Sequence, residues 1–228
     1  MKKITDICVI IQARLGSQRV PEKMIKPIGD SCLFDISLKK VKQCKSFPAD
    51  NFYASVWEPE LKRIAQAHNV NIFNRSEHSA KSEGTPMTSM YEWWNKLPYK
   101  YCILVSACAP FLEPETIDEF VEHYRRCSSD GLFGIIKKKN YFWNSQKEIL
   151  TPLTESVMNT KTVNSTFEAA HCLYAGRLDK IGQEIWMGDF RTPGDIELFE
   201  VPERESFDVD YQWQFDMVKN ILERGAIT

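Results

Sequence analysis

The sequence predicts an α/β protein with an open, doubly wound sheet. Short apolar runs rich in β-branched residues alternate along the chain with segments of helical periodicity. A continuous apolar run is typical of a strand buried on both faces, as in a parallel sheet. Strands that alternate with helices at this spacing indicate an open sheet covered by helices.

The predicted elements follow one another in a regular order. Asp30 and Ser31 can cap the first helix, and the polar segment 74–86 is predicted to be a loop. The predicted strands are 7–11, 52–56, 70–73, 101–105 and 132–136, and the predicted helices are 30–45, 59–68, 87–96, 114–126 and about 213–224.

The regular alternation stops between residues 137 and about 202. Aromatic residues are common there, beginning with Tyr141, and prolines and glycines interrupt any periodicity. A length of 228 residues suits one domain or one domain with an insertion. We therefore expect a single domain over residues 1–228 that carries an inserted arm or lid over about 137–202.

The composition of the chain limits the kinds of partner that we expect the protein to bind. The net charge of −2 gives no general attraction to nucleic acid or to an anionic membrane. The apolar run 7–11 is too short for a signal peptide, and no run approaches the length of a membrane span. The seven cysteines are scattered without a CxxC pair, which favours free thiols over zinc ligands or disulfides. We expect a cytoplasmic protein without nucleic-acid or membrane partners.

The loop after the first strand has the composition of a phosphate site. Ligands of open α/β sheets bind at the carboxyl ends of strands. Gly16 and Ser17 permit close backbone approach to an anion, and Arg14, Arg19 and Lys23 supply three cations. A triphosphate is a dense polyanion that needs such a cluster. Neither a Walker loop nor GxGxxG is present, and the alternative interpretation is a solvated basic turn.

A carboxylate pair near the end of the chain is the candidate metal site. Asp208 and Asp210 are two residues apart, so on a strand both side chains point to one face. Mg²⁺ prefers one or two carboxylates together with phosphate oxygens and water. The alternative is a polar strand end in which Asp210 caps the following helix.

These residues lie in stretches that resemble a known family. The stretch 10–23, IIQARLGSQRVPEK, resembles the opening of the CMP-sugar synthetases, which include the acylneuraminate and 3-deoxy-manno-octulosonate cytidylyltransferases. It is also similar to related spore-coat polysaccharide synthesis proteins. Three further stretches, 104–114, 167–174 and 205–211, resemble later blocks of the family in the same order.

The resemblance implies a mixed, mainly parallel sheet of the nucleotide-diphospho-sugar transferase type, and a homodimer formed through the inserted arm. It implies transfer of CMP from CTP to the hydroxyl of an acidic sugar, with Mg²⁺ as cofactor and pyrophosphate as second product. The implied residues are Arg19 and Lys23 for catalysis, Gln12, Ala13, Arg14, Gly16, Ser17, Arg75 and Ser106 for the nucleotide, Asp208 and Asp210 for the metal, and His171 and Glu168 for the sugar.

Several interpretations stay open at the level of sequence. Arg75 could belong to an ordinary surface loop, and His171 could be a hydrogen-bonded core residue. Met24 stands where the family often has Asn, and Cys108 lies in a turn where two branches carry Asp, so metal binding depends more on the C-terminal pair. The alternatives in function are a nucleotidyltransferase with another nucleotide or acceptor, and a catalytically silent nucleotide-binding module.

Overall fold

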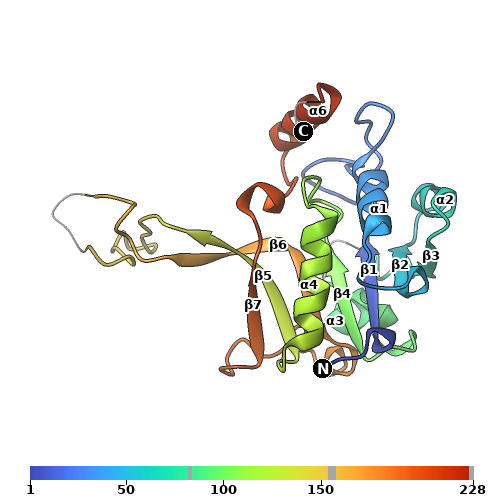
Figure 1. The fold of residues 1–228 in the computed structure, drawn as a ribbon. Coiled ribbons are helices and arrows are strands. Elements are labelled where there is room, and N and C mark those ends of the chain that lie inside the picture. Colours follow the sequence, from blue (N-terminus) through green and yellow to red (C-terminus); the bar gives the residue numbers. More distant parts are fainter. Residues whose placement is uncertain (82–83, 154–157, 226–228) are drawn as a thin grey trace.

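A computed structural model describes residues 1–81, 84–153 and 158–225 (Figure 1). Seven strands form one sheet in the order β3-β2-β1-β4-β6-β5-β7. Their bounds are β1 (Ile7–Gln12), β2 (Phe52–Val56), β3 (Asn71–Asn74), β4 (Tyr101–Val105), β5 (Gly131–Lys138), β6 (Thr166–Arg177) and β7 (Ile196–Glu200). Only β6 runs antiparallel to its neighbours, so the sheet is mixed and mainly parallel, as predicted.

Six α-helices and four short 3₁₀ helices connect and cover the strands in this part of the chain. The α-helices are α1 (Leu33–Gln43), α2 (Pro59–Ala67), α3 (Met87–Met90), α4 (Pro114–Arg126), α5 (Leu178–Ile181) and α6 (Gln212–Glu223), and the 3₁₀ helices are η1 (Ile4–Asp6), η2 (Ala49–Asn51), η3 (Glu92–Asn95) and η4 (Glu203–Ser206). Among the described residues, no helix has the length and apolarity needed to cross a membrane.

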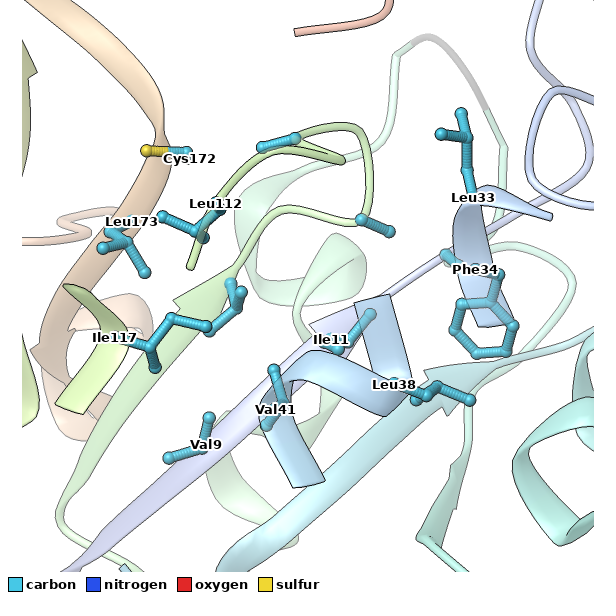
Figure 2. Packing of buried hydrophobic residues seen from close by; sticks show 14 of the residues in the cluster. Val9, Ile11, Leu33, Phe34, Leu38, Val41, Leu112, Ile117, Cys172 and Leu173 are labelled. Atoms are coloured by element: carbon cyan, nitrogen blue, oxygen red, sulfur yellow. The ribbon is translucent and has the colours of Figure 1, made fainter. Parts of the chain in front are cut away.

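Strand β1 shows why the apolar run is continuous. Val9 and Ile11 are fully buried in a core shared with α1 and α4, whereas Cys8 and Ile10 are fully buried in a second core on the other face. Figure 2 shows Val9 and Ile11 beneath the side chains that α1 contributes, such as Leu38. A strand buried on both faces needs apolar residues at every position, because successive side chains point to opposite sides.

Two predicted helices differ from those observed. Neither Asp30 nor Ser31 caps α1, because residues 28–31 form a tight turn closed by reciprocal backbone hydrogen bonds between Ile28 and Ser31. The predicted helix 87–96 is split into α3 and η3 at Tyr91, whose backbone leaves the helical region. The split allows Trp93 to enter the core completely.

The predicted insertion over 137–202 was too long. Strand β6 lies inside the sheet between β4 and β5, and β7 forms its edge beside β5. The stretch 167–174, whose resemblance to the family implies a strand after the arm, lies within β6. The edge strand β7 was not predicted, because it is only partly buried. The segment that projects from the body lies between β5 and β6, at the far end of the ribbon formed by these strands (Figure 1). We call residues 139–153 and 158–165 the arm.

Candidate active site

Two adjoining cavities lie at the carboxyl ends of β1 and β4. The first has a volume of about 440 Å³ and the second about 510 Å³. Neighbouring parallel strands end at the same edge of the sheet, so the segments that follow them meet there. Both cavities are lined by Gln12, Ala13, Arg14, Arg19, Cys108 and Asp210; the first adds Arg75, Ser79, Lys81, Met90, Tyr91, Leu104, Val105, Ser106, Ala107, His171, Tyr174 and Asp208, and the second adds Gly16, Ser17, Gln18, Lys23 and Met24.

The predicted phosphate loop forms one wall of the second cavity. Val20 is fully buried and anchors the middle of the loop in the core. The Ser17 amide donates to the Leu15 carbonyl at 2.7 Å, which produces a tight turn at Gly16. Met24 is buried in the core and also borders this cavity, so the thioether occupies the place at which the family often has an amide. The buried side chains of Val20 and Met24 thus fix the loop, and its polar residues line the cavity.

Two of the three cations of this loop reach the C-terminal segment of the chain, whereas Arg14 Nη1 donates to the Lys81 carbonyl. Arg19 Nη2 lies 2.5 Å from Asp210 Oδ1, and Lys23 Nζ lies 3.6 Å from the same oxygen. Lys23 Nζ also donates to the Val209 carbonyl at 2.6 Å. Residues from the two ends of the sequence therefore meet at one site, as the motifs led us to expect.

The aspartate pair lies on an extended segment outside the sheet. The Val209 amide donates to the Cys108 carbonyl at 3.0 Å, which attaches this segment to the turn after β4. Gln214 Oε1 accepts the amides of Asp210 and Tyr211 at 2.7 and 2.8 Å. Gln214 therefore caps the start of α6, and the alternative role of Asp210 as a helix cap is wrong.

The environment of Asp208 fits a cation. Its Oδ1 is buried and has no hydrogen-bond partner within the described ranges. Burial raises the pKa of Asp208, and the nearby Asp210 carboxylate raises it further. An unpaired buried carboxylate oxygen is costly, and a divalent cation would offset this cost. No group of three or more His, Cys, Asp or Glu side chains in the described residues is placed to hold a metal, so the pair would leave coordination positions for phosphate and water.

Arg75 lies in the first cavity beneath a short loop. Its side chain is buried, with only 3% of the residue exposed, although Glu77, His78 and Lys81 of the loop that follows are exposed. Nε donates to Ser79 Oγ at 3.0 Å, and the guanidinium also donates to the Ser79 carbonyl. Burial, followed by the charge of Arg14, lowers the pKa of Arg75 to about 10.

Gln12 and Ser106 line the first cavity, and hydrogen bonds fix the positions of both residues. Gln12 Oε1 accepts from Trp93 Nε1 at 2.9 Å and from Ser55 Oγ at 3.3 Å, which orients the amide. The Ser106 amide donates to the Cys172 carbonyl at 2.9 Å, so this residue joins β4 to β6 at the edge of the site.

The two predicted sugar residues are separated. His171 lines the first cavity, and its Nδ1 is 3.2 Å from the hydroxyl of Tyr174. It lies where β6 bulges away from β5, with a left-handed φ of 53°. Glu168 does not line either cavity: its side chain is 57% exposed, and Oε2 lies 3.6 Å from Lys138 Nζ. Glu168 therefore lies outside the site. It precedes, along β6, the bulge at which His171 lines the cavity.

Sequence reasoning missed several residues that shape the site. Glu58 Oε1 accepts the Leu15 amide at 2.7 Å, and its Oε2 is buried without a partner in the described part of the chain. Pro59 predicts that α2 begins directly after Glu58. It does not predict the direction in which the Glu58 carboxylate points. Tyr174 was missed in the same way, since the β6 bulge brings its hydroxyl to His171.

Comparison with known proteins defines the family. A family model described as Cytidylyltransferase matches residues 8–180. The chain therefore belongs to the cytidylyltransferase family, whose members are nucleotidyltransferase enzymes, and the resemblance found in the sequence is confirmed.

Individual relatives are distant. The chain is 27% identical over 133 residues to a spore coat polysaccharide biosynthesis protein of Bacillus subtilis, which covers 56% of this chain and 53% of that protein. It is 26% identical over 198 residues to a 3-deoxy-manno-octulosonate cytidylyltransferase of Rickettsia felis, covering 85% of this chain and 68% of that enzyme. The match thus spans only about half the length of the spore coat relative.

The fold is shared with solved structures. A CMP:2-keto-3-deoxy-manno-octonic acid synthetase complexed with CTP superposes with a TM-score of 0.70, covering 96% of this chain and 99% of the other. At 14% identity, this likeness establishes the fold alone.

Glu58 provides a test of how the phosphate loop is held. We expect Glu58→Ala to accelerate hydrogen exchange at the Leu15 amide about tenfold or more, because a hydrogen bond to a charged acceptor is lost. Glu58→Gln keeps a side-chain oxygen and should retain most of the protection. Glu60→Ala is the matched control, since Glu60 lies two residues later in the first turn of α2, and its ion pair within the described residues is with the exposed Arg63. Unchanged exchange in Glu58→Ala would show that the carboxylate does not hold the loop.

Proposed function

We propose that the protein is a cytidylyltransferase that activates an acidic sugar with CTP, giving a CMP-sugar and pyrophosphate. The observation that carries this proposal is the meeting of Arg19 and Lys23 with Asp208 and Asp210 around two adjoining cavities. A cluster of cations beside paired carboxylates is the arrangement that a metal-bound triphosphate requires.

The choice of CTP is supported by the family and by the shape of the site. The chain belongs to the cytidylyltransferases, and a solved structure with the same fold is complexed with CTP. The second cavity, with Gly16, Ser17 and Lys23, would take the phosphates. The first, with Arg75 and Ser106, would take the nucleoside and the acceptor.

The reaction would be an in-line attack by a sugar hydroxyl on the α-phosphorus. A new bond forms between the sugar oxygen and the α-phosphorus, and the bond from that phosphorus to the oxygen that bridges the α- and β-phosphates breaks. The hydroxyl proton passes to solvent, and pyrophosphate departs with the bridging oxygen. Arg19 and Lys23 would neutralise the charge that develops on the pyrophosphate. Both cavities would hold the two substrates in the orientation that the attack requires.

Asp208 and Asp210 are the residues that would hold a divalent cation, as the unpaired Asp208 Oδ1 suggests. When bound there, Mg²⁺ would neutralise phosphate charge and orient the phosphate oxygens. The chain itself contributes one buried oxygen of Asp208 and the partly exposed carboxylate of Asp210.

The proposal also specifies the acceptor, an acidic sugar. Relatives include an enzyme named for 3-deoxy-manno-octulosonate, which is a sugar acid. His171 and Tyr174 line the first cavity beyond Ser106 and would contact the acceptor. The spore coat relative favours a second candidate, a nucleotidyltransferase with another nucleotide or acceptor. Cys108, in a turn where related branches carry a carboxylate, is the feature that keeps a catalytically silent module as a further candidate.

A pyrophosphate-release assay tests the function. The four nucleoside triphosphates are each combined with sugar acids and sugar phosphates, and we expect release with CTP and a sugar acid. Lys23→Ala should lower kcat about 100-fold or more, because a charge-stabilising donor is removed. Lys26→Ala is the matched control, since Lys26 contacts Gln212 and lines neither cavity. Triphosphate binding without turnover of any pair would support the silent module instead.

We also propose that the protein is a homodimer formed through the arm. Large apolar side chains that are each more than half exposed gather on the arm, which is unusual for a surface without a partner. They are Trp143, Leu150, Leu153 and Met158.

Light scattering tests the oligomeric state. We expect the wild type to have the mass of two chains, and Trp143→Ser to shift the population toward one chain by removing buried apolar area. Trp57→Ser is the control, because Trp57 is another exposed tryptophan but lies after β2, outside the arm. A monomeric wild type at micromolar concentration would contradict the proposal.

A further inference from the structure

The cations of the phosphate loop already hold an anion of the chain itself. Asp210 Oδ1 lies 2.5 Å from Arg19 Nη2 and 3.6 Å from Lys23 Nζ. Both cations therefore contact the C-terminal segment at the point where Asp210 borders the second cavity. Arg19 has an additional hold, since its guanidinium lies 5.3 Å from the centre of the Tyr211 ring.

The position of this contact places it in the path of both expected ligands. Arg19 and Asp210 each line both cavities. A triphosphate in the second cavity needs Arg19 and Lys23, whereas a cation beside Asp208 needs the Asp210 carboxylate. Asp210 Oδ1 already has two positive groups within 4 Å, so a cation that approaches this oxygen competes with Arg19 and Lys23 for its negative charge.

We propose that Asp210 acts as an internal competitor for the phosphate loop, holding Arg19 and Lys23 until a divalent cation takes the carboxylate and a triphosphate takes the cations. This inference rests on the proposed function in assuming that a triphosphate binds at the loop. Its consequence is positive coupling: each ligand frees the groups that the other requires, and such coupling is reciprocal.

The ion pair between Arg19 and Asp210 is exposed enough for a triphosphate to replace Asp210 as the partner of Arg19. The side chains of Arg19 and Asp210 are 54% and 29% exposed. Ion pairs of this kind are weak, since both groups remain partly solvated. A triphosphate offers Arg19 several charged oxygens in place of one, so the exchange favours the ligand.

Asp208 provides the matched comparison. It lines the first cavity within two residues of Asp210, but its Oδ1 has no partner in the described part of the chain, and no ion pair joins Asp208 to Arg19 or Lys23 among those residues. Neutralising either aspartate removes one negative charge near the phosphates. Only neutralising Asp210 also removes the ion-pair partner that Arg19 and Lys23 share.

The test is binding of inorganic triphosphate, measured by calorimetry with EDTA present. We expect Asp210→Asn to bind about fivefold more tightly than wild type, and Asp208→Asn to change by less than about twofold. Melting temperatures of all three proteins establish that each is folded. Equal tightening by the two variants would show a general charge effect and overturn the proposal, as would unchanged or weaker binding by Asp210→Asn.

A second titration with Mg²⁺ in place of EDTA measures the coupling. Mg²⁺ should tighten triphosphate binding by the wild type more than by Asp210→Asn, and equal tightening would contradict the proposal. Inorganic triphosphate has no nucleobase. Its binding therefore tests the competition by Asp210 even if the pyrophosphate-release assay rejects CTP or the sugar acid. A complete lack of triphosphate binding by every protein, with and without Mg²⁺, would overturn both the competitor and the proposed function.

Discussion

The attachment of the C-terminal segment to the phosphate loop is the constraint on which the site depends. The Val209 amide is held by the Cys108 carbonyl, and the Val209 carbonyl accepts from Lys23 Nζ. These two bonds use the backbone of one residue to join the C-terminal segment to the turn after β4 and to the loop after β1. Together with the Arg19–Asp210 and Lys26–Gln212 contacts, they bring the cations near residue 20 beside the carboxylates near residue 210. Figure 1 shows the result, with the segment leading to α6 beside the loop that follows β1.

The rest of the fold supports this attachment from below. Because β1 and β4 are neighbours in the sheet, the loops after them meet at one edge. The turn after β4 is then held from two sides: Lys40 of α1 donates to the Leu112 carbonyl at 2.7 Å, and the buried Glu205 accepts the Glu113 amide at 3.1 Å. A rigid turn fixes the Cys108 carbonyl and, through it, the aspartates. Such support matters because charge stabilisation depends on groups that are positioned before the reaction begins.

The sequence predicted the features that local chemistry determines. A buried strand followed by three cations and two small residues predicted a phosphate loop, and the spacing of Asp208 and Asp210 predicted a carboxylate pair on one face; the structure places the two segments side by side, and phosphate binding stays a prediction. Features set by contacts between distant segments were not accessible. The burial of Arg75, the contact from Glu58 to the loop and the displacement of Glu168 all follow from how β2, β3 and β6 are placed in the sheet. The limits of the arm were misjudged for the same reason, since β6 and β7 become strands only by pairing with β4 and β5.

In the proposed function one nucleotide occupies both cavities, with its phosphates against the N-terminal loop. A crystal structure with CTP and Mg²⁺ tests this placement. We expect phosphate oxygens within hydrogen-bond distance of Lys23 and of the Ser17 amide, the cytidine beside Arg75 and Ser106, and Arg19 moved from Asp210 to the phosphates. Phosphates bound away from residues 14–23, or a nucleotide outside the two cavities, would contradict it.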